Sequence, residues 1–286
     1  MKNQTPENYI YENFPIKNPV LYCLRVFIKI FFFTFFGIGT IFLSILIFPI
    51  MKLIFRDKLV FQKNARKIVS KTFKFFLFII KLTGALKISI DNTKKISELK
   101  AGIVVANHPS LIDVVILISQ ISNADAIVNS NLAGKNIVHF IINALYITNN
   151  LPHDELIKKC VESLHNGNVL IIFPEGTRST CFGQNQYKKG AARIAIASGC
   201  PIVPIFIGGN NKVGLGKKES MFSFNHTGPY IYNLCVKETI NPQEFSELKE
   251  TVAAKRITDK IKNSLSYENN MDKLIGINKK NPLFNY

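Results

Sequence analysis

A histidine and an aspartate with the spacing His-x-x-x-x-Asp form a pair that could move a proton. His108 and Asp113 lie in the stretch Asn-His-Pro-Ser-Leu-Ile-Asp. A general base must be neutral at rest to accept a proton from an attacking hydroxyl. A carboxylate that accepts from one ring nitrogen fixes the tautomer and leaves the other nitrogen for a substrate. The alternative is a histidine that only caps a loop, with the aspartate placed favourably in a first helical turn.

The elements around this pair are predicted to hold it at the end of a strand. The apolar, β-branched run 103–106 is typical of a buried strand. Apolar residues at helical spacing follow up to Ser119, so we expect a helix to begin at or near Pro109 or Ser110. The histidine would then lie beside a helix N-terminus, whose dipole favours neutral imidazole. The aspartate would lie about one turn into the helix.

A second polar cluster follows another apolar run, 169–173, which also reads as a strand. Residues 174–179 are Pro-Glu-Gly-Thr-Arg-Ser. Arg178 offers a planar fork for phosphate or carboxylate, and Gly176 allows close backbone approach. Ligands gather at the carboxyl ends of strands in open α/β sheets, so the two motifs are expected to face one cleft. The alternative is an exposed turn in which Glu175 and Arg178 pair with each other.

Together the two motifs resemble the first and third sequence blocks of the 1-acylglycerol-3-phosphate acyltransferase (PlsC-like) family. The resemblance runs over roughly 87–239. It implies an α/β fold, with a mixed sheet flanked by helices, and acyl transfer from an acyl thioester to a lipid hydroxyl. It makes His108 and Asp113 the catalytic pair. It assigns substrate binding to Glu175, Gly176, Thr177, Arg178, Lys188 and Pro204.

The last two of those residues come from shorter matches. The stretch 187–190, Tyr-Lys-Lys-Gly, resembles a Phe-Lys-x-Gly that follows the third block, so Lys188 would meet a phosphate of the donor or acceptor. The alternative is a solvated pair of lysines. The stretch 200–205, Cys-Pro-Ile-Val-Pro-Ile, resembles the fourth block, in which Pro204 would line a channel for the acyl or pantetheine chain. Without the family, it reads as a buried strand with prolines.

The second block of the family is where this chain departs from the pattern. The family has an arginine there that contacts the acceptor phosphate, whereas 143–150 is Asn-Ala-Leu-Tyr-Ile-Thr-Asn-Asn. Asn149 or Asn150 stands in its place, and an amide supplies no positive charge. Either Arg178 and Lys188 compensate for the missing charge, or the acceptor is an amino-acid lipid, a glycolipid or another hydroxylated lipid.

The expected reaction is direct attack of the acceptor hydroxyl on an acyl carrier protein or acyl-CoA thioester. We expect no other cofactor and no metal. No Gly-x-Ser-x-Gly motif is present, so we expect no covalent intermediate. Backbone N–H groups near the helix start, together with Arg178, would stabilise the oxyanion. The competing readings are a thioesterase, in which water replaces the lipid, and a non-catalytic lipid-binding protein.

Composition indicates an anionic partner. The chain of 286 residues has a formal net charge of +17, is 47% hydrophobic and contains 23 Phe. Nucleic acid, anionic lipid and an acidic carrier protein would all suit this charge. No recognisable nucleic-acid motif accompanies it, so we expect lipid rather than nucleic acid. The five cysteines form no Cys-x-x-Cys pair, which favours reduced thiols over a zinc site or a disulfide framework.

Two apolar stretches precede the motifs. The stretch 30–51 has no charged residue and is long enough to span a bilayer, although a buried core helix would look similar. The heavier basic flank follows it, which places the later residues on the cytoplasmic side of the inner membrane if the helix spans. The stretch 73–82 is too short to span and reads as an interfacial helix. Alternatively, both stretches lie in one leaflet as a monotopic anchor.

The chain is therefore expected to contain four parts. These are a polar lead-in (1–25), membrane-associated helices (26–85), a catalytic domain (86–265) and a loosely held tail (266–286). Strands and helices alternate through the third part, as in α/β domains. The further expected strands are 87–90, 126–128, 202–207 and 230–239, and the further expected helices are 135–145, 151–166, 190–198 and 245–265.

Overall fold

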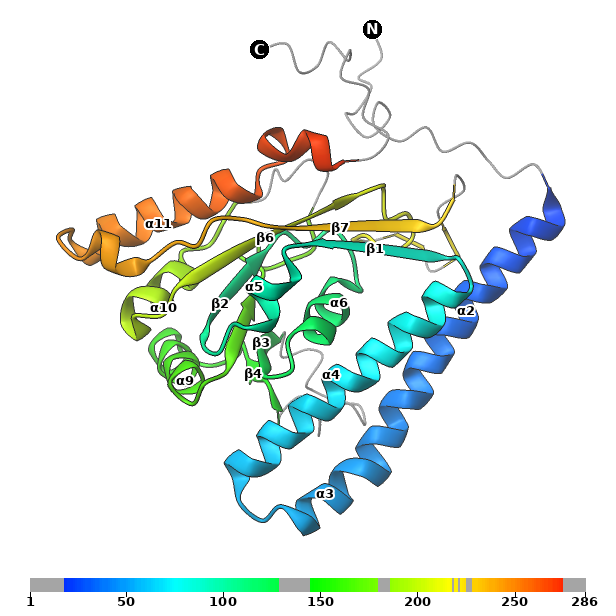
Figure 1. Ribbon diagram of the computed structural model, residues 1–286, viewed down its shortest axis with the longest axis horizontal. Helices are drawn as coiled ribbons and strands as arrows, with labels where there is room; N and C mark the ends of the chain where they lie inside the picture. Colours follow the sequence, from blue (N-terminus) through cyan, green and yellow to red (C-terminus); the bar gives the residue numbers. More distant parts are fainter. Residues whose placement is uncertain are drawn as a thin grey trace, which may run out of the picture.

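A seven-stranded mixed sheet forms the centre of the molecule, with helices on both of its faces (Figure 1). The computed structural model describes residues 18–128, 145–179, 186–217, 219–220, 222–224 and 228–274. The strand order β1-β7-β6-β2-β5-β3-β4 confirms the predicted α/β class with a mixed sheet. The strands are β1 (Leu86–Asp91), β2 (Gly102–Ala106), β3 (Ala124–Val128), β4 (Ile147–Thr148), β5 (Val169–Ile172), β6 (Ile202–Gly209) and β7 (Tyr230–Val236).

Strand β2 is central because every residue in it is apolar or glycine and buried. It pairs in parallel with β5 and with β6, so that Val104 lies between Ile171 and Val203. Only the β6–β7 pair is antiparallel among the described strand pairs. The carboxyl ends of β2, β3, β4, β5 and β6 therefore meet at one edge of the sheet, as the two sequence motifs require.

One face of the sheet carries α9 (His153–His165), α10 (Gly190–Ser198) and α11 (Glu250–Leu265). Helix α11 docks because its apolar residues recur at helical spacing and form one buried stripe. The opposite face carries α6 (Asp113–Gln120) and the N-terminal helices. Short helical segments complete the domain: α5 (Thr93–Ser97) and the 3-10 segments Pro242–Phe245 and Glu268–Lys273.

The N-terminal part is a helical hairpin, residues 19–82, that lies along the face carrying α6 (Figure 1). Its first arm comprises α2 (Pro19–Phe42), a π-helical segment (Leu43–Ile47) and α3 (Phe48–Ile54), and its second arm is α4 (Lys58–Leu82). The stretch 73–82 is helical as expected, but the helix begins earlier, at Lys58. This stretch is the last part of α4, whose lysines lie on one exposed side while its apolar side packs on α6 and β3.

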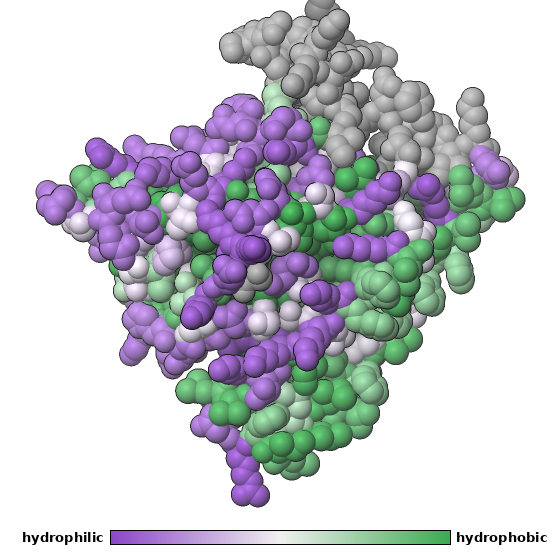
Figure 2. All heavy atoms as spheres, in the orientation of Figure 1, coloured by the Kyte–Doolittle hydropathy of each residue, from purple (hydrophilic) through white to green (hydrophobic). Residues whose placement is uncertain are grey.

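Much of the hairpin's outer surface is apolar. The run Pro19–Ile54 is long and apolar enough to cross a membrane, and it lies near the N-terminus of the described residues. Figure 2 shows hydrophobic side chains gathered over the hairpin, whereas hydrophilic ones dominate the rest of that face. An exposed apolar surface of this kind marks an interaction site. Its exposed residues include Phe27, Phe31, Phe42, Leu53 and Phe78.

Several element boundaries differ from the sequence-based expectation. Helix α2 begins at Pro19, inside the expected polar lead-in, because the Asn18 side chain caps it. The tail is held as far as residue 274, where Asn270 is buried and Leu274 bridges to Gly209. Most of the expected helix 135–145 lies outside the described residues.

The helix expected at Pro109 or Ser110 begins only at Asp113, so the aspartate is its first residue. The reason is local. The Ser110 amide and hydroxyl both donate to the Asp113 carboxylate, and the Leu111 amide donates to Leu215 O. These contacts hold the residues between the histidine and the aspartate in a turn.

A buried ion pair fastens the hairpin to the sheet. Arg66 on α4 donates to Asp125 on β3 at 3.0 Å and to Leu145 O at 3.0 Å. Ser163 also donates to the Asp125 carboxylate, at 2.6 Å. Burial raises the pKa of Asp125 and the charge of Arg66 opposes that shift. Without Arg66, the carboxyl must take up a proton or remain an uncompensated buried charge.

We therefore expect Arg66→Met to lower the free energy of unfolding by about 3–5 kcal/mol. Thermal and chemical denaturation would measure the loss. The matched control is Lys67→Met, which removes a neighbouring exposed charge and should change stability by less than about 0.5 kcal/mol. Equal effects of the two substitutions would show that the ion pair does not fasten the hairpin.

Candidate active site

The site is built at the carboxyl end of β2. Asn107, fully buried, donates to Ile207 O at 3.0 Å and accepts from Ile207 N at 2.7 Å. This side chain continues the pairing of β2 with β6 beyond the last strand residue. The backbone that carries His108 is therefore fixed to the neighbouring strand.

His108 and Asp113 form the predicted pair. The His108 Nδ1 atom lies 2.9 Å from Asp113 Oδ2, and the carboxylate is fully buried. The same carboxylate accepts from the Ser110 amide at 2.6 Å and from the Ser110 hydroxyl at 2.5 Å. It can therefore accept the Nδ1 proton, which leaves Nε2 as the basic nitrogen of the ring. Nε2 has no hydrogen-bond partner among the described residues, and the His108 side chain is 19% exposed.

The imidazole is also held from the side. Its ring stacks on Phe173 with centroids 4.1 Å apart and an interplanar angle of 20°. Phe173 directly follows β5. The residues next to the third block therefore supply an aromatic wall against the ring of His108 in the first block. The ring is thus fixed by a hydrogen bond and by a flat apolar contact, an arrangement that suits proton transfer at one defined position.

Behind the carboxylate, a hydroxyl relay reaches into the core. The Tyr232 hydroxyl lies 2.8 Å from Ser110 Oγ, and since Ser110 donates to Asp113, Tyr232 must donate to Ser110. Tyr232 is fully buried, and burial raises its pKa well above the usual value. The phenol therefore keeps its proton and serves as a donor.

Glu175 joins the two motifs. Its Oε1 atom accepts from the His108 amide at 3.2 Å and from the Ser179 hydroxyl at 2.6 Å, and the residue is 4% exposed. The Ser179 amide donates to His108 O at 2.6 Å. The third block is therefore more than an exposed turn, because its buried carboxylate helps to position the backbone of the base.

Gly176 and Lys188, both predicted substrate-binding residues, lie against each other. Gly176 has φ +67°, and a Cβ built on it would lie 2.8 Å from Lys188 Nζ. Lys188 is exposed, and its amide donates to Pro174 O at 2.8 Å. Thr177, next to this pair, is half-buried. The structure thus brings the lysine ammonium to the third block, as the resemblance implies.

We expect Gly176→Ala to destabilise the chain by about 1–2 kcal/mol, because an L-residue is strained at this positive φ. The new methyl would also displace the Lys188 ammonium, so KM for an anionic acceptor should rise. Denaturation and steady-state kinetics would measure both effects. The control is Gly190→Ala, where the added Cβ meets open space at an ordinary φ and should be neutral.

Arg178 is anchored by the β6–β7 connection. Its Nη1 atom donates to Leu215 O at 3.1 Å and to Gly216 O at 2.6 Å. Leu215 O also accepts from the Leu111 amide at 2.9 Å. One carbonyl of this connection therefore links the third block to the turn between His108 and Asp113. The connection is tied to α2 as well, since Lys29 Nζ donates to Gly214 O at 2.9 Å.

The amides of the turn before α6 are already engaged. The amides of His108, Ser110 and Leu111 donate to Glu175 and Ser179, to Asp113 and to Leu215, and Pro109 has none. These three amides are therefore not available to a developing oxyanion. The prediction of backbone donors at the helix start then concerns the first amides of α6, from Asp113 onward.

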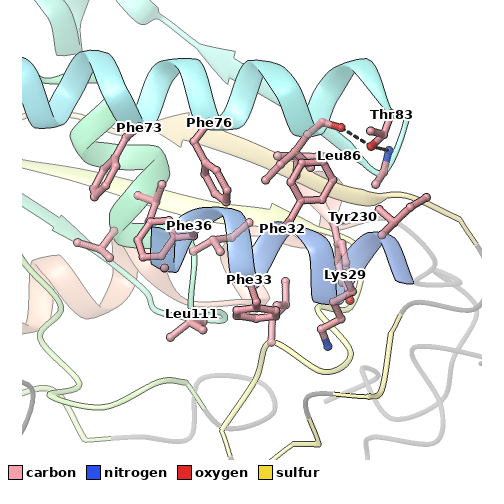
Figure 3. Close-up of a pocket in the computed structure, with 18 of the residues that line it drawn as sticks. Lys29, Phe32, Phe33, Phe36, Phe73, Phe76, Thr83, Leu86, Leu111 and Tyr230 are labelled. Carbon is pink, nitrogen blue, oxygen red and sulfur yellow. Dashed lines mark hydrogen bonds between the residues drawn. The ribbon is translucent and has the colours of Figure 1, made fainter. Parts of the chain in front are cut away.

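A large apolar cavity of about 950 Å³ lies between the hairpin and the sheet. Figure 3 shows its aromatic lining, with Phe32 and Phe36 from α2 beside Phe73 and Phe76 from α4, while Phe33 points to the other side of α2. Leu111 and Ile112, from the turn between His108 and Asp113, also line it. The cavity therefore runs from the exposed hairpin to the residues that carry the pair, and its lining suits a hydrocarbon chain.

Two predicted features lie apart from this cavity. Pro204 is buried in β6 opposite Val105, and within the described part of the chain it does not line the cavity. Asn149 and Asn150 form an exposed turn after β4, at the edge of the sheet where β2 and β5 end. The structure thus brings seven of the eight predicted residues close to the strand ends of the two motifs, and Pro204 is the exception.

Sequence reasoning missed Asn107, Phe173, Ser110 and Tyr232 as positioning residues. Asn107 and Ser110 lie inside the first motif, where a polar residue after a strand was the available signal, and Phe173 ends the apolar run before the second motif. Tyr232 lies in a separate strand, and nothing in its local sequence marks it. Only the fold brings its hydroxyl to Ser110.

Comparisons with known proteins bear on the family and the fold of this chain. Residues 87–208 match the family model described as Acyltransferase. A chloroplastic 1-acyl-sn-glycerol-3-phosphate acyltransferase of Arabidopsis thaliana is 28% identical over 152 residues, 49% of this chain and 43% of the relative. The chain thus matches less than half the length of this plant relative.

Two bacterial comparisons cover more of the chain. A protein of Mycoplasma pneumoniae named probable 1-acyl-sn-glycerol-3-phosphate acyltransferase is 23% identical over 74% of this chain and 87% of its own length. The crystal structure of the 1-acyl-sn-glycerophosphate acyltransferase PlsC from Thermotoga maritima superposes with a TM-score of 0.59. It covers 84% of this chain and 95% of that one at 23% identity, which is a likeness of fold.

Proposed function

Because residues 87–208 form a domain of the acyltransferase family, we propose that this chain moves an acyl group from an acyl thioester to a lipid hydroxyl. The proposed acceptor is a lysophospholipid such as 1-acylglycerol-3-phosphate. The observation that carries the proposal is the apolar cavity, whose wall includes the turn between His108 and Asp113. A proton-transfer pair beside a hydrocarbon-sized cavity suits chemistry on a lipid.

In the proposed reaction, His108 Nε2 removes the proton of the acceptor hydroxyl while the oxygen attacks the thioester carbonyl. Asp113 holds the Nδ1 proton and stabilises the imidazolium that forms. The C–O bond of the ester forms and the C–S bond breaks. The imidazolium then returns the proton to the departing sulfur. The donor is acyl carrier protein or acyl-CoA, and no further cofactor takes part.

The polar end of the acceptor would meet the basic groups of the third block. Arg178 and Lys188 both lie at the edge where β5 ends, and both can donate to phosphate. Since the amides of His108, Ser110 and Leu111 are engaged, we assign part of the oxyanion stabilisation to Arg178 as well. Positive side chains at this place favour an anionic acceptor over a neutral one.

We further propose that the hairpin is a membrane anchor that lies flat. Arg25 donates to Gly228 O at 2.8 Å and Lys29 donates to Gly214 O, so α2 is bound to the catalytic domain near its start. Phe48, in α3, is fully buried and packs on Phe61 of α4, the arm that lies on α6. A hairpin fastened to the domain at the start of α2 and along α4 is unsuited to cross a bilayer, whereas its exposed apolar side can enter one leaflet. The basic residues of α4 would face anionic headgroups at the cytoplasmic side of the inner membrane.

A second acceptor class follows from the turn after β4. Asn149 and Asn150 are exposed at the edge where the acceptor would bind, and neither carries a charge. This placement favours an acceptor whose headgroup is bound by amides, such as an amino-acid lipid or a glycolipid. The two acceptor classes would give different labelled lipids, and only the first would give phosphatidic acid.

The test is acyl transfer in anionic vesicles, with labelled acyl carrier protein and acyl-CoA thioesters offered in parallel. The acceptors are lysophosphatidic acid, a lyso-amino-acid lipid and a total lipid extract. Labelled phosphatidic acid would support the first acceptor class. Label in another lipid, with lysophosphatidic acid inert, would support the second. No labelled ester with any acceptor would overturn the proposed activity.

A further inference from the structure

A buried lysine lies behind the catalytic pair, and the reaction described above does not use it. Lys212 follows β6 and is 4% exposed. Its ammonium donates to Gly208 O at 3.3 Å, to Ile231 O at 2.7 Å and to Asn210 O. Three donors thus meet three carbonyls. The position suits a buried positive charge, because the three carbonyl oxygens accept the three protons of the ammonium.

The ammonium also faces the hydroxyl relay. Lys212 Nζ lies 4.4 Å from the centroid of the Tyr232 ring. A cation over an aromatic face draws electron density from the ring and makes the phenol a stronger donor. The Tyr232 hydroxyl donates to Ser110, whose hydroxyl donates to Asp113. The positive charge thus reaches the catalytic carboxylate through one ring and two hydroxyls.

The buried Asp113 carboxylate needs a positive charge nearby, which Lys212 can supply. Asp113 is fully buried, and His108 must be neutral when the acceptor arrives. A buried carboxylate needs a compensating positive charge. Among the described residues, Lys212 is the buried cation whose charge couples to Asp113. The titratable groups around this region are Asp113 and His108, Tyr230 and Tyr232 on β7, Lys29 on α2 and Glu219 in the β6–β7 connection.

We propose that Lys212 is a positioning residue for proton transfer, whose charge acts through Tyr232 and Ser110 to set the protonation balance of the Asp113–His108 pair. A positive charge behind the carboxylate disfavours a second positive charge on the imidazole, and this is the effect that the proposal assigns to Lys212. The kinetic test of this proposal, kcat/KM against pH, rests on the proposed function. A second test, chemical modification of His108, does not.

The pH dependence has a definite sign. Burial lowers the pKa of Lys212 to about 7, although the charge of Asp113 opposes the shift. Lys212 is therefore charged below about pH 7 and loses its charge as the pH rises above that value. Its influence should appear on the acidic limb of the pH profile, where protonation of His108 limits the rate, and should fade at higher pH.

The test compares Lys212→Met with wild type across the pH range. We expect the acidic limb of kcat/KM to move up by about one pH unit, so activity near pH 6 falls about tenfold. Activity near pH 8 should change little. Lys212→Arg keeps a charge and should restore the acidic limb. Lys217→Met, an exposed lysine in the same connection, is the matched control and should leave the profile unchanged.

The second readout is carbethoxylation of His108 by diethyl pyrocarbonate, followed by mass spectrometry. This reagent modifies neutral imidazole, so its rate against pH reports His108 protonation whether or not the chain transfers acyl groups. In Lys212→Met, the midpoint of the modification rate against pH should rise by the same amount as the acidic limb of kcat/KM. A shift here without acyl transfer in wild type would overturn the proposed function and leave the role of Lys212 standing.

Tyr232→Phe tests whether the charge of Lys212 acts through the Tyr232 hydroxyl, because this variant removes the hydroxyl and keeps the ring under the ammonium. It should move both readouts in the same direction as Lys212→Met, and the double variant should add little. If Lys212→Met does not fold, Tyr232→Phe carries the test alone. Unchanged pH profiles with a lowered melting temperature would overturn the proposal, because Lys212 would then only cap carbonyls. A rise in KM at every pH would overturn it too, by indicating substrate contact.

Discussion

Replacing His108 by alanine should lower kcat for acyl transfer by about 10³–10⁴-fold. The Nε2 atom is the basic nitrogen of the site, because Nδ1 lies 2.9 Å from the buried Asp113 carboxylate. Without it, the acceptor hydroxyl has no proton acceptor at the strand end. Residual activity would reflect only the binding of donor and acceptor side by side. Initial rates in vesicles, with labelled thioester, would measure the loss.

The fold should survive this substitution. His108 is 19% exposed, and the contacts that fix its backbone involve its amide and carbonyl rather than its ring. Melting temperature and binding to anionic vesicles should therefore match wild type. His153→Ala, an exposed histidine at the start of α9, is the matched control and should keep full activity. Undiminished activity in His108→Ala would show that another group is the base.

Replacing Asp113 by asparagine should cost a similar factor, about 10³–10⁴-fold in kcat. The shape of the side chain is kept. Its amide oxygen can accept from His108 Nδ1 and from the Ser110 amide, and its NH₂ can donate to the Ser110 hydroxyl, which then donates to Tyr232. The hydrogen bonds are therefore conserved in number, while the negative charge that stabilises the imidazolium is lost.

This design separates charge from shape. Melting temperature should change by only a few degrees, because no buried group loses its partner. Asp154→Asn, fully exposed on α9, controls for the removal of a carboxylate and should be neutral. Activity within about tenfold of wild type, in a folded Asp113→Asn protein, would mean that the aspartate only positions the ring.

The sequence was sufficient to predict the sheet, the two strand ends and the contact between His108 and Asp113. Short β-branched runs such as 103–106, bounded by turn residues, are typical of a buried strand, so β2 and β5 were found almost to the residue. The polar residues after each run then had to lie at one edge of the sheet. The pairing of His108 with Asp113 follows from that edge and from their spacing.

The start of α6 and the extent of the hairpin were not predictable in the same way. Helical periodicity continues through the residues after Ser110, but side-chain hydrogen bonds to Asp113 hold them in a turn. Lysines interrupt the apolar pattern of α4, so its first half read as a basic flank. In the structure these lysines lie on the outer side of one continuous helix.

Residues whose contacts lie far away in the sequence could not be predicted from their own sequence neighbours. Tyr232 reaches Ser110 from another strand, and Lys212 reaches Tyr232 from the β6–β7 connection. Glu175 was expected to contact substrate, whereas its buried carboxylate also binds the His108 amide. Such roles depend on the register between strands, which composition and spacing do not specify.

The most direct measurement is the fate of a labelled acyl thioester given to the wild-type protein in anionic vesicles, with and without a lysolipid acceptor. We predict that with acceptor the label enters a lipid ester, and that without acceptor it stays in the thioester. Release of label as free fatty acid at the same rate in both cases would contradict acyl transfer to a lipid hydroxyl and would identify a thioesterase.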